Sequence, residues 1–101
     1  MKTALVKFEA IEPKTAEQLE KLLLQLAERT SSENGLKFYE IFKGEENNTI
    51  YYVRESWETD EHFNEHLNQP HLQKFVDEVT LLLKEQFSFT RILTVKSIVK
   101  N

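Results

Sequence analysis

The sequence predicts an α+β protein in which one antiparallel sheet carries helices on one face. Two patterns predict this class: short segments of alternating apolar residues, and longer segments whose apolar residues recur every three or four positions. They follow one another in the order β-α-β-β-α-α-β, which suits a ferredoxin-like sheet. The chain has 101 residues, 40% hydrophobic and 30% charged, so we expect one domain over residues 1–101 with a single modest core.

The first strand and helix are marked by a change of period. Residues 3–10 alternate apolar and polar side chains and predict a strand. Pro13 breaks this pattern, and Thr15-Ala16-Glu17-Gln18 fits a capping box that opens a helix. Helical spacing of leucines behind the box predicts a helix to about Ser31, with Gly35 as a natural stop.

Two aromatic-rich strands follow, at residues 36–43 and 49–57, with residues 44–48 as a hairpin loop. On the first, Leu36, Phe38 and Phe42 oppose Tyr39 and Ile41; on the second, Tyr51, Val53, Glu55 and Trp57 oppose Ile50 and Tyr52. Both faces are therefore partly apolar, whereas the helices cover one. We expect a homodimer packed sheet to sheet, and the alternative is a monomer with scattered exposed aromatics.

Two further helices and a strand complete the order. Thr59 fits an N-cap, and the acidic residues after it suit the first turn of a short helix. Pro70 fits the first turn of a second helix, whose apolar stripe runs over residues 72–83. Residues 88–99 predict the closing strand.

Composition excludes several classes of function. The formal charge is −4 with a pI of about 5.4, and no run of Lys or Arg is present, so we expect no nucleic-acid partner. The chain has no cysteine, which excludes disulfides, thiol nucleophiles and thiolate metal sites. No segment resembles a signal peptide or is long enough to span a membrane, so we expect a cytoplasmic protein.

The stretch His62-Phe63-Asn64-Glu65-His66 matches the H-x-x-E-H pattern of inverted zincins. On a helix, His66 flanks the apolar stripe and His62 leans toward water. A catalytic zinc site needs a third protein ligand, and Asp77, Glu78 and Glu85 have no geometric reason to converge on the pair. We therefore expect no metal site, and we expect His66 to line an interior pocket.

A longer pattern surrounds this histidine. The run Glu55-x-Trp57-x8-His66-x4-His71-x3-Phe75 resembles the antibiotic biosynthesis monooxygenase domain, in particular its small quinol-monooxygenase-like members. Residues 33–41, ENGLKFYEI, are similar to that family's E-x-G-x-x-x-Y turn and strand. The resemblance implies a dimeric α/β barrel of ferredoxin-like subunits. It also implies a pocket between sheet and helices, and an oxygenase that needs no metal, flavin or other cofactor.

The resemblance implies roles for six residues. His66 is the expected catalytic base for a small aromatic quinol that reacts with O2, and Glu55, which faces the helices, is expected to contact and orient it. The expected substrate-binding residues are Trp57, Phe75, Tyr39 and Tyr51. Each has a structural alternative: core packing for the Trp and the Phe, dimer contacts for the tyrosines, ion pairing for Glu55, and a backbone bond for His66. His71 is expected to be exposed or capping.

Other functions stay open. A haem-degrading branch of the superfamily uses an Asn on its first strand, and residues 3–10 contain none. Another branch isomerises a phosphorylated autoinducer sugar, whose phosphate needs grouped cations; Lys7, Arg54 and Arg91 are not grouped by the sequence alone. A dimeric small-molecule-binding or stress-associated protein that lacks the chemistry is the third alternative, because a fold does not transmit activity.

Overall fold

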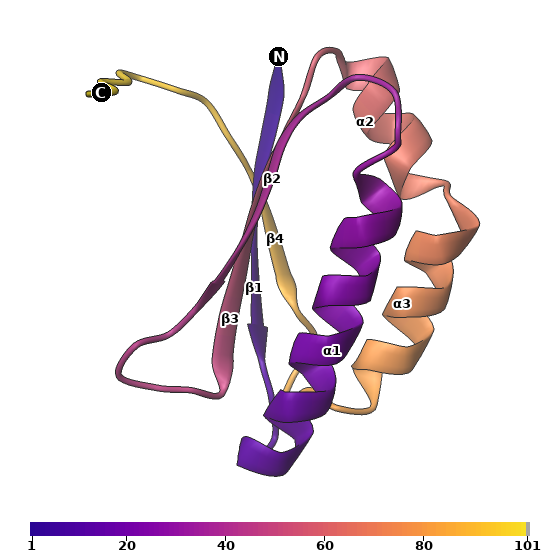
Figure 1. Ribbon diagram of the computed structural model, residues 1–101, viewed down its shortest axis with the longest axis vertical. Coiled ribbons are helices and arrows are strands. Elements are labelled where there is room, and N and C mark those ends of the chain that lie inside the picture. Colours follow the sequence, from indigo (N-terminus) through magenta and orange to yellow (C-terminus); the bar gives the residue numbers. More distant parts are fainter. Residues whose placement is uncertain (101) are drawn as a thin grey trace.

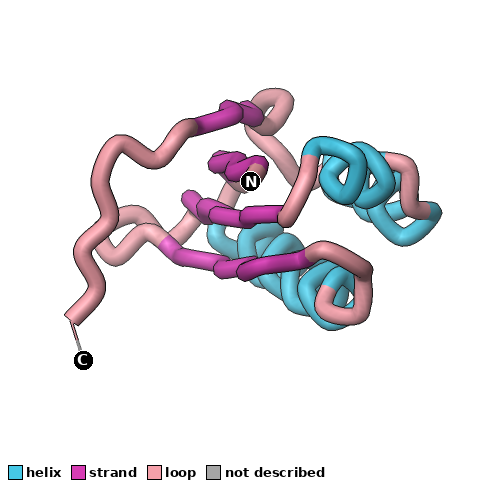
Figure 2. The backbone as a smooth tube through the Cα atoms, turned by 90° about the horizontal axis from the view of Figure 1, so that it is seen from above, coloured by secondary structure: helices cyan, strands magenta, loops and turns pink. Residues whose placement is uncertain are grey.

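The computed structural model describes residues 1–100 of the protein. The elements are β1 (Lys2–Glu9), α1 (Pro13–Thr30), β2 (Leu36–Lys43), β3 (Ile50–Trp57), α2 (Asp60–Leu67), α3 (Pro70–Thr80) and β4 (Ser88–Ile92). The strands form one antiparallel sheet in the order β2-β3-β1-β4. All three helices lie on one side of it (Figures 1 and 2). The predicted ferredoxin-like α+β architecture is confirmed.

Helix α1 begins earlier than the sequence indicated. Pro13 is its first residue and Glu12 its N-cap, so the predicted capping box opening at Thr15 is wrong. Thr15 instead lies in the first turn, where its Oγ1 accepts a hydrogen bond of 3.0 Å from the Glu12 N–H. Proline starts a helix well because its missing N–H would have no partner there. Within residues 1–100, no helix is both long and apolar enough to cross a membrane.

The closing strand is shorter than predicted. It ends at Ile92, which pairs with Thr3 near the start of β1. Residues 93–96 continue the alternation of apolar and polar side chains, but β1 offers almost no further backbone to pair with. Figure 1 shows the segment after Ile92 leaving the sheet. Its large apolar side chains are exposed, namely Leu93, Val95, Ile98 and Val99.

The inner face of the sheet builds the core. Val6, Phe8, Tyr51 and Val53 are buried there against α1 and α3. One expected face assignment changes at the start of β2. An irregularity between Leu36 and Phe38 places Leu36 opposite Trp57, and it packs on the helix side rather than sharing a face with Phe38. An extra residue in one strand shifts the alternation, which sequence periodicity does not reveal.

Candidate active site between sheet and helices

His66 lies in the last turn of α2 and is buried, with 2% of its surface exposed. Phe63, one turn earlier, is 1% exposed, so both side chains lie on the helix face that meets the sheet. The imidazole stacks on the Trp57 ring, with centroids 4.6 Å apart and 28° between the planes. This stacking in a buried site restricts the orientation of the imidazole.

A buried carboxyl lies beside this imidazole. Glu55 and Trp57 are two residues apart on β3 and point to the same side. The Trp57 Nε1–H donates a 2.9 Å hydrogen bond to Glu55 Oε1, and His66 Nε2 lies 3.5 Å from the same oxygen. Burial raises the pKa of Glu55, against the opposing effects of His66 and the Trp57 N–H. Perturbed groups of this kind are frequent in functional sites.

Glu55 and His66 both border a cavity of about 190 Å³ between the sheet and the helices. Most of its lining is apolar: Val6, Phe8, Leu26, Val53, Leu67, Leu72, Phe75, Val76, Phe87 and Phe89. Tyr39 and Gln73 add further polar groups. Burial, together with the charges of Glu55 and Glu33, raises the pKa of Tyr39, so its phenol stays neutral and can donate a hydrogen bond. The cavity thus combines an apolar wall with a few convergent polar groups, as binding sites do.

The expected substrate-binding residues divide into two groups. Phe75 and Tyr39 line the cavity. Trp57 does not, because it is fully buried with its ring against His66. Tyr51 does not either: it lies four residues before Glu55, roughly 13 Å along the strand, and its hydroxyl donates a 2.8 Å hydrogen bond to Glu20.

The other ring nitrogen of His66 faces a different set of groups. Its Nδ1 lies 3.0 Å from Oε2 and 3.1 Å from Oε1 of Glu33, in the turn between α1 and β2. The same Oε2 is 2.7 Å from Nε2 of His71, at the start of α3. The expected exposed or capping His71 is thus corrected, because its side chain is only 17% exposed and is bonded to Glu33.

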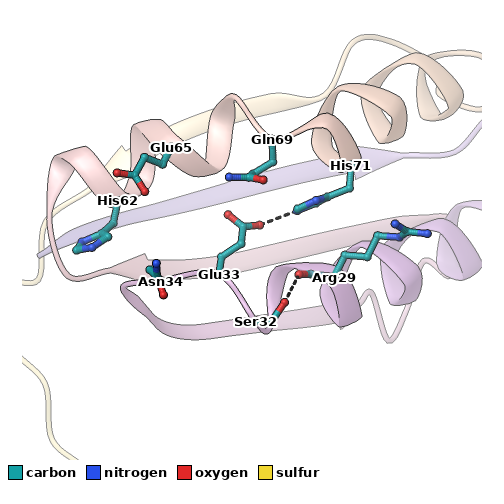
Figure 3. Close-up of a pocket in the computed structure, with 8 residues that line it drawn as sticks. All are labelled: Arg29, Ser32, Glu33, Asn34, His62, Glu65, Gln69 and His71. Carbon is teal, nitrogen blue, oxygen red and sulfur yellow. Dashed lines mark hydrogen bonds and ion pairs between the residues drawn. The ribbon is translucent and has the colours of Figure 1, made fainter.

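Glu33 and His71 lie on the wall of a polar pocket of about 450 Å³ (Figure 3). The other lining residues are Arg29, Ser32, Asn34, His62, Glu65 and Gln69. The sequence did not suggest a site role for Glu33 or His71, although both fall inside the two segments that resemble the family. Their positions in those segments were the available signal.

Gly35 shapes the turn that carries Glu33. Its φ of 81° is in the left-handed region that favours glycine, and an added Cβ would overlap the His62 ring. His62 Nδ1 is 2.8 Å from Oγ1 of Thr59, the N-cap of α2. In the described part of the chain, the two histidines of the H-x-x-E-H pattern therefore join different networks.

Comparisons with known proteins agree with this architecture. A family model described as antibiotic biosynthesis monooxygenase matches residues 1–78. No curated protein matches the sequence.

Solved structures of similar fold cover nearly the whole chain. A Deinococcus radiodurans protein is 20% identical, covers 100% of this chain and 99% of its own, and has a TM-score of 0.88. PA3566 from Pseudomonas aeruginosa is 22% identical over 94% and 95% of the two chains, with a TM-score of 0.81. A variant of SnoaB, a cofactor-independent oxygenase from Streptomyces nogalater, is 12% identical over 98% and 97%, with a TM-score of 0.85. From the match over residues 1–78, the chain belongs to the antibiotic biosynthesis monooxygenase family.

Proposed function

We propose that the protein is a cofactor-independent monooxygenase that oxidises a small quinol-type aromatic substrate with O2. The observation that carries the proposal is the buried Glu55–His66 pair on the wall of an otherwise apolar cavity. The family match supports the reaction class. The fold shared with SnoaB, described as a cofactor-independent oxygenase, is consistent with it.

The reaction needs a base before it needs an oxidant. Dioxygen reacts slowly with closed-shell molecules, whereas a hydroquinone becomes a far better electron donor once a phenolic proton is removed. His66 is the proposed base, because its imidazole can accept a proton and it borders the apolar cavity beside Glu55. One molecule of hydroquinone and one of O2 then give one molecule of hydroxyquinone and one of water. One oxygen atom enters the ring and the other leaves as water, with all four electrons from the substrate.

The surrounding residues divide the remaining tasks. Glu55 lies against the imidazole and would stabilise the cation that forms when His66 takes the proton. Phe75 offers a ring face to the substrate, and the neutral Tyr39 hydroxyl can donate a hydrogen bond to the phenolate. Trp57 acts as a positioning residue, because it stacks on His66 and donates to Glu55. Tyr51 is left out of this proposed site, because its hydroxyl is bonded to Glu20 and it is not among the residues that line the cavity.

The size of the cavity limits the substrate. Its volume is about 190 Å³, and apolar protein cavities of about 150 Å³ bind benzene. A single substituted ring therefore fits, whereas a fused polycyclic quinol requires the cavity to open. We propose a monocyclic hydroquinone or polyphenol as the substrate class.

The test is oxygen uptake by metal-free protein with a panel of monocyclic and fused-ring hydroquinones. His66→Ala should lower kcat/KM by about 10²–10⁴-fold. His62→Ala, a histidine on the same helix but outside the cavity, is the matched control and should keep the wild-type rate. Equal rates in wild type and His66→Ala would remove His66 from the chemistry. Under ¹⁸O2, one labelled atom should appear in the product; formation of hydrogen peroxide without incorporation would contradict a monooxygenase.

Two alternatives are separated by the same assay. Saturable binding of a ring compound without oxygen uptake would indicate a non-catalytic binder. A sugar-phosphate isomerase would need cations around the phosphate, and no Lys or Arg is among the residues that line the apolar cavity. Conversion of a phosphorylated sugar without O2 would nevertheless overturn the oxygenase proposal.

We also propose that the active form is a homodimer packed through its sheet faces. The outward face of the sheet exposes apolar surface, including Leu5 and Phe42, at 37% and 47%. The exposed apolar side chains of residues 93–99 add to it. Sedimentation should give twice the chain mass of 12.0 kDa, and Phe42→Glu should shift the protein toward the monomer. A wild-type protein that sediments as a monomer at micromolar concentration would reject this arrangement.

A further inference from the structure

Three ligand atoms converge at the junction of α2 and α3, where the helices meet the α1–β2 turn. His66 Nδ1, His71 Nε2 and a Glu33 carboxylate oxygen all lie within 4.8 Å of one another. They come from three separate elements, so the arrangement is set by the tertiary fold and not by one helix repeat. Two imidazoles and one carboxylate are a donor set that Zn²⁺ and similar divalent ions accept.

We propose that Glu33, His66 and His71 form a binding site for a divalent transition-metal ion, with Zn²⁺ as the best-suited ion. Ligand atoms about 2.0–2.2 Å from a tetrahedral metal lie roughly 3.4 Å apart. The two hydrogen-bonded separations are 3.0 and 2.7 Å, so Glu33 must withdraw by about half an ångström to admit the ion. The Glu33 side chain is on a turn and has several rotatable bonds, which makes this adjustment small.

The contact of the second His66 nitrogen, Nε2, supports this assignment. A metal-bound histidine usually gives its other ring N–H to a carboxylate, which fixes the orientation and tautomer of the ring. His66 already has Glu55 Oε1 3.5 Å from Nε2, on the side away from Glu33. Glu55 is itself held by the Trp57 N–H. Glu55 would therefore be the outer partner of the site.

Charge favours a cation at this point. The side chains of Glu33 and Glu55 are 9% and 5% exposed, and they face opposite nitrogens of one imidazole. Carboxylates with so little solvent exposure need a compensating charge, which a divalent ion supplies. Arg29 also lines the polar pocket and could compensate this charge, but its guanidinium extends away from Glu33 (Figure 3).

The site is also accessible. Glu33 and His71 form part of the wall of the polar pocket, where an ion can enter and where water can complete its coordination (Figure 3). Binding on this side leaves the apolar cavity unobstructed. With the ion bound, His66 would be a ligand through Nδ1 with Nε2 protonated, so the metal-loaded protein should lack the free base that the proposed oxygenase requires. The inference goes beyond the proposed oxygenase and does not depend on it.

The experiment is a titration of EDTA-treated, dialysed protein without a polyhistidine tag, using Zn²⁺ by calorimetry and Co²⁺ by absorption. Trp57 is the only tryptophan and stacks on His66, so Co²⁺ or Ni²⁺ should quench its fluorescence. One ion per chain should bind. His71→Ala and Glu33→Gln should each weaken binding by at least about 10–100-fold, the loss typical even for an outer partner.

The matched control is Asp77→Asn, which removes an exposed carboxylate of α3 that does not line the polar pocket and should keep wild-type affinity. Circular dichroism shows whether each variant is folded, so a loss of binding caused by unfolding can be recognised. No binding at millimolar metal, or binding that Asp77→Asn weakens and His71→Ala does not, would overturn the site. Oxygen uptake by the EDTA-treated protein is measured separately, so failure of the metal site and failure of the oxygenase are distinguishable.

Discussion

The two nitrogens of His66 face two regions of opposite chemistry. Toward Nε2 lies a cavity with mostly apolar walls, and Glu55 is the buried carboxyl group beside it. Toward Nδ1 lies a polar pocket, where Glu33 and His71 are held by hydrogen bonds and remain partly open to solvent. The stability of the first region depends on how well apolar side chains fill its volume. The stability of the second depends on hydrogen bonds between ionisable groups. Substitutions on the two sides should therefore have different energetic costs.

The largest expected effect is on the apolar side. Phe75 is 6% exposed and packs edge-on against Phe8, with ring centroids 5.8 Å apart. Phe75→Ala should lower the free energy of unfolding by roughly 3–5 kcal/mol, measured by urea denaturation, because a large buried side chain is lost. Leu24→Ala, at a helix position 56% exposed, should stay within about 0.5 kcal/mol. Similar values for the two variants would show that the cavity wall is not tightly packed.

A smaller effect is expected in the turn that positions Glu33. Gly35→Ala should cost roughly 1–3 kcal/mol, because alanine is strained at positive φ, and its Cβ would also collide with the His62 ring. His62→Ala in the same chain should recover the collision part and leave the backbone strain. Thermal and urea unfolding of both variants measure this. Wild-type stability in Gly35→Ala would contradict the turn geometry.

On the polar side, His71→Ala in the presence of EDTA should cost about 1–2 kcal/mol. It removes a 2.7 Å hydrogen bond to a carboxylate from a partly exposed side chain. The expected loss is below that of Phe75→Ala because water can replace the imidazole. Urea unfolding with EDTA measures the difference. A loss as large as that of Phe75→Ala would mean that packing also holds this side.

Tyr51 offers the smallest effect and a pH signature. Burial of its ring and the hydrogen bond to Glu20 raise its pKa from 10.0 to about 12. Because the folded pKa is raised, the stabilisation is fully present below pH 10 and is lost as the pH rises through about 12. Tyr51→Phe should therefore be less stable than wild type by about 1 kcal/mol at pH 8, and the gap should close in alkali. Urea midpoints at pH 8, 10 and 11.5 test this; a constant gap would contradict it.

Much of the fold was predictable, because the spacing of apolar residues along a segment indicates which of its faces is buried. The range 36–43 and the N-cap at Thr59 were predicted from turn, capping and alternation signals, and the structure has both. The strand over 88–99 was predicted too long. Its alternation continues past Ile92 to Lys96, but a strand needs a neighbour, and Ile92 already pairs with Thr3, one residue from the start of β1. Where a strand ends therefore depends on the length of its neighbour in the sheet, which the local sequence of the strand does not contain.

The site shows the same division. The sequence placed Glu55 on the strand face toward the helices and His66 beside the apolar stripe of its helix, but it did not determine whether the two side chains meet. In the fold, His66 Nε2 lies 3.5 Å from Glu55 Oε1. Trp57 shares that strand face, yet periodicity cannot say whether its ring lines the cavity or packs behind His66. It packs behind His66. Contact within one face depends on side-chain packing, which the pattern does not encode.

By itself, the sequence determined the order of elements, the faces of the strands apart from the start of β2, and the family to which the chain belongs. Only the tertiary structure decided which polar groups meet. Glu33 and His71 are 38 positions apart and follow no shared repeat. They meet because the left-handed Gly35 directs one turn and the α2–α3 junction at Pro70 directs the other. Distances across such junctions depend on chain geometry far apart in sequence, which local patterns cannot report.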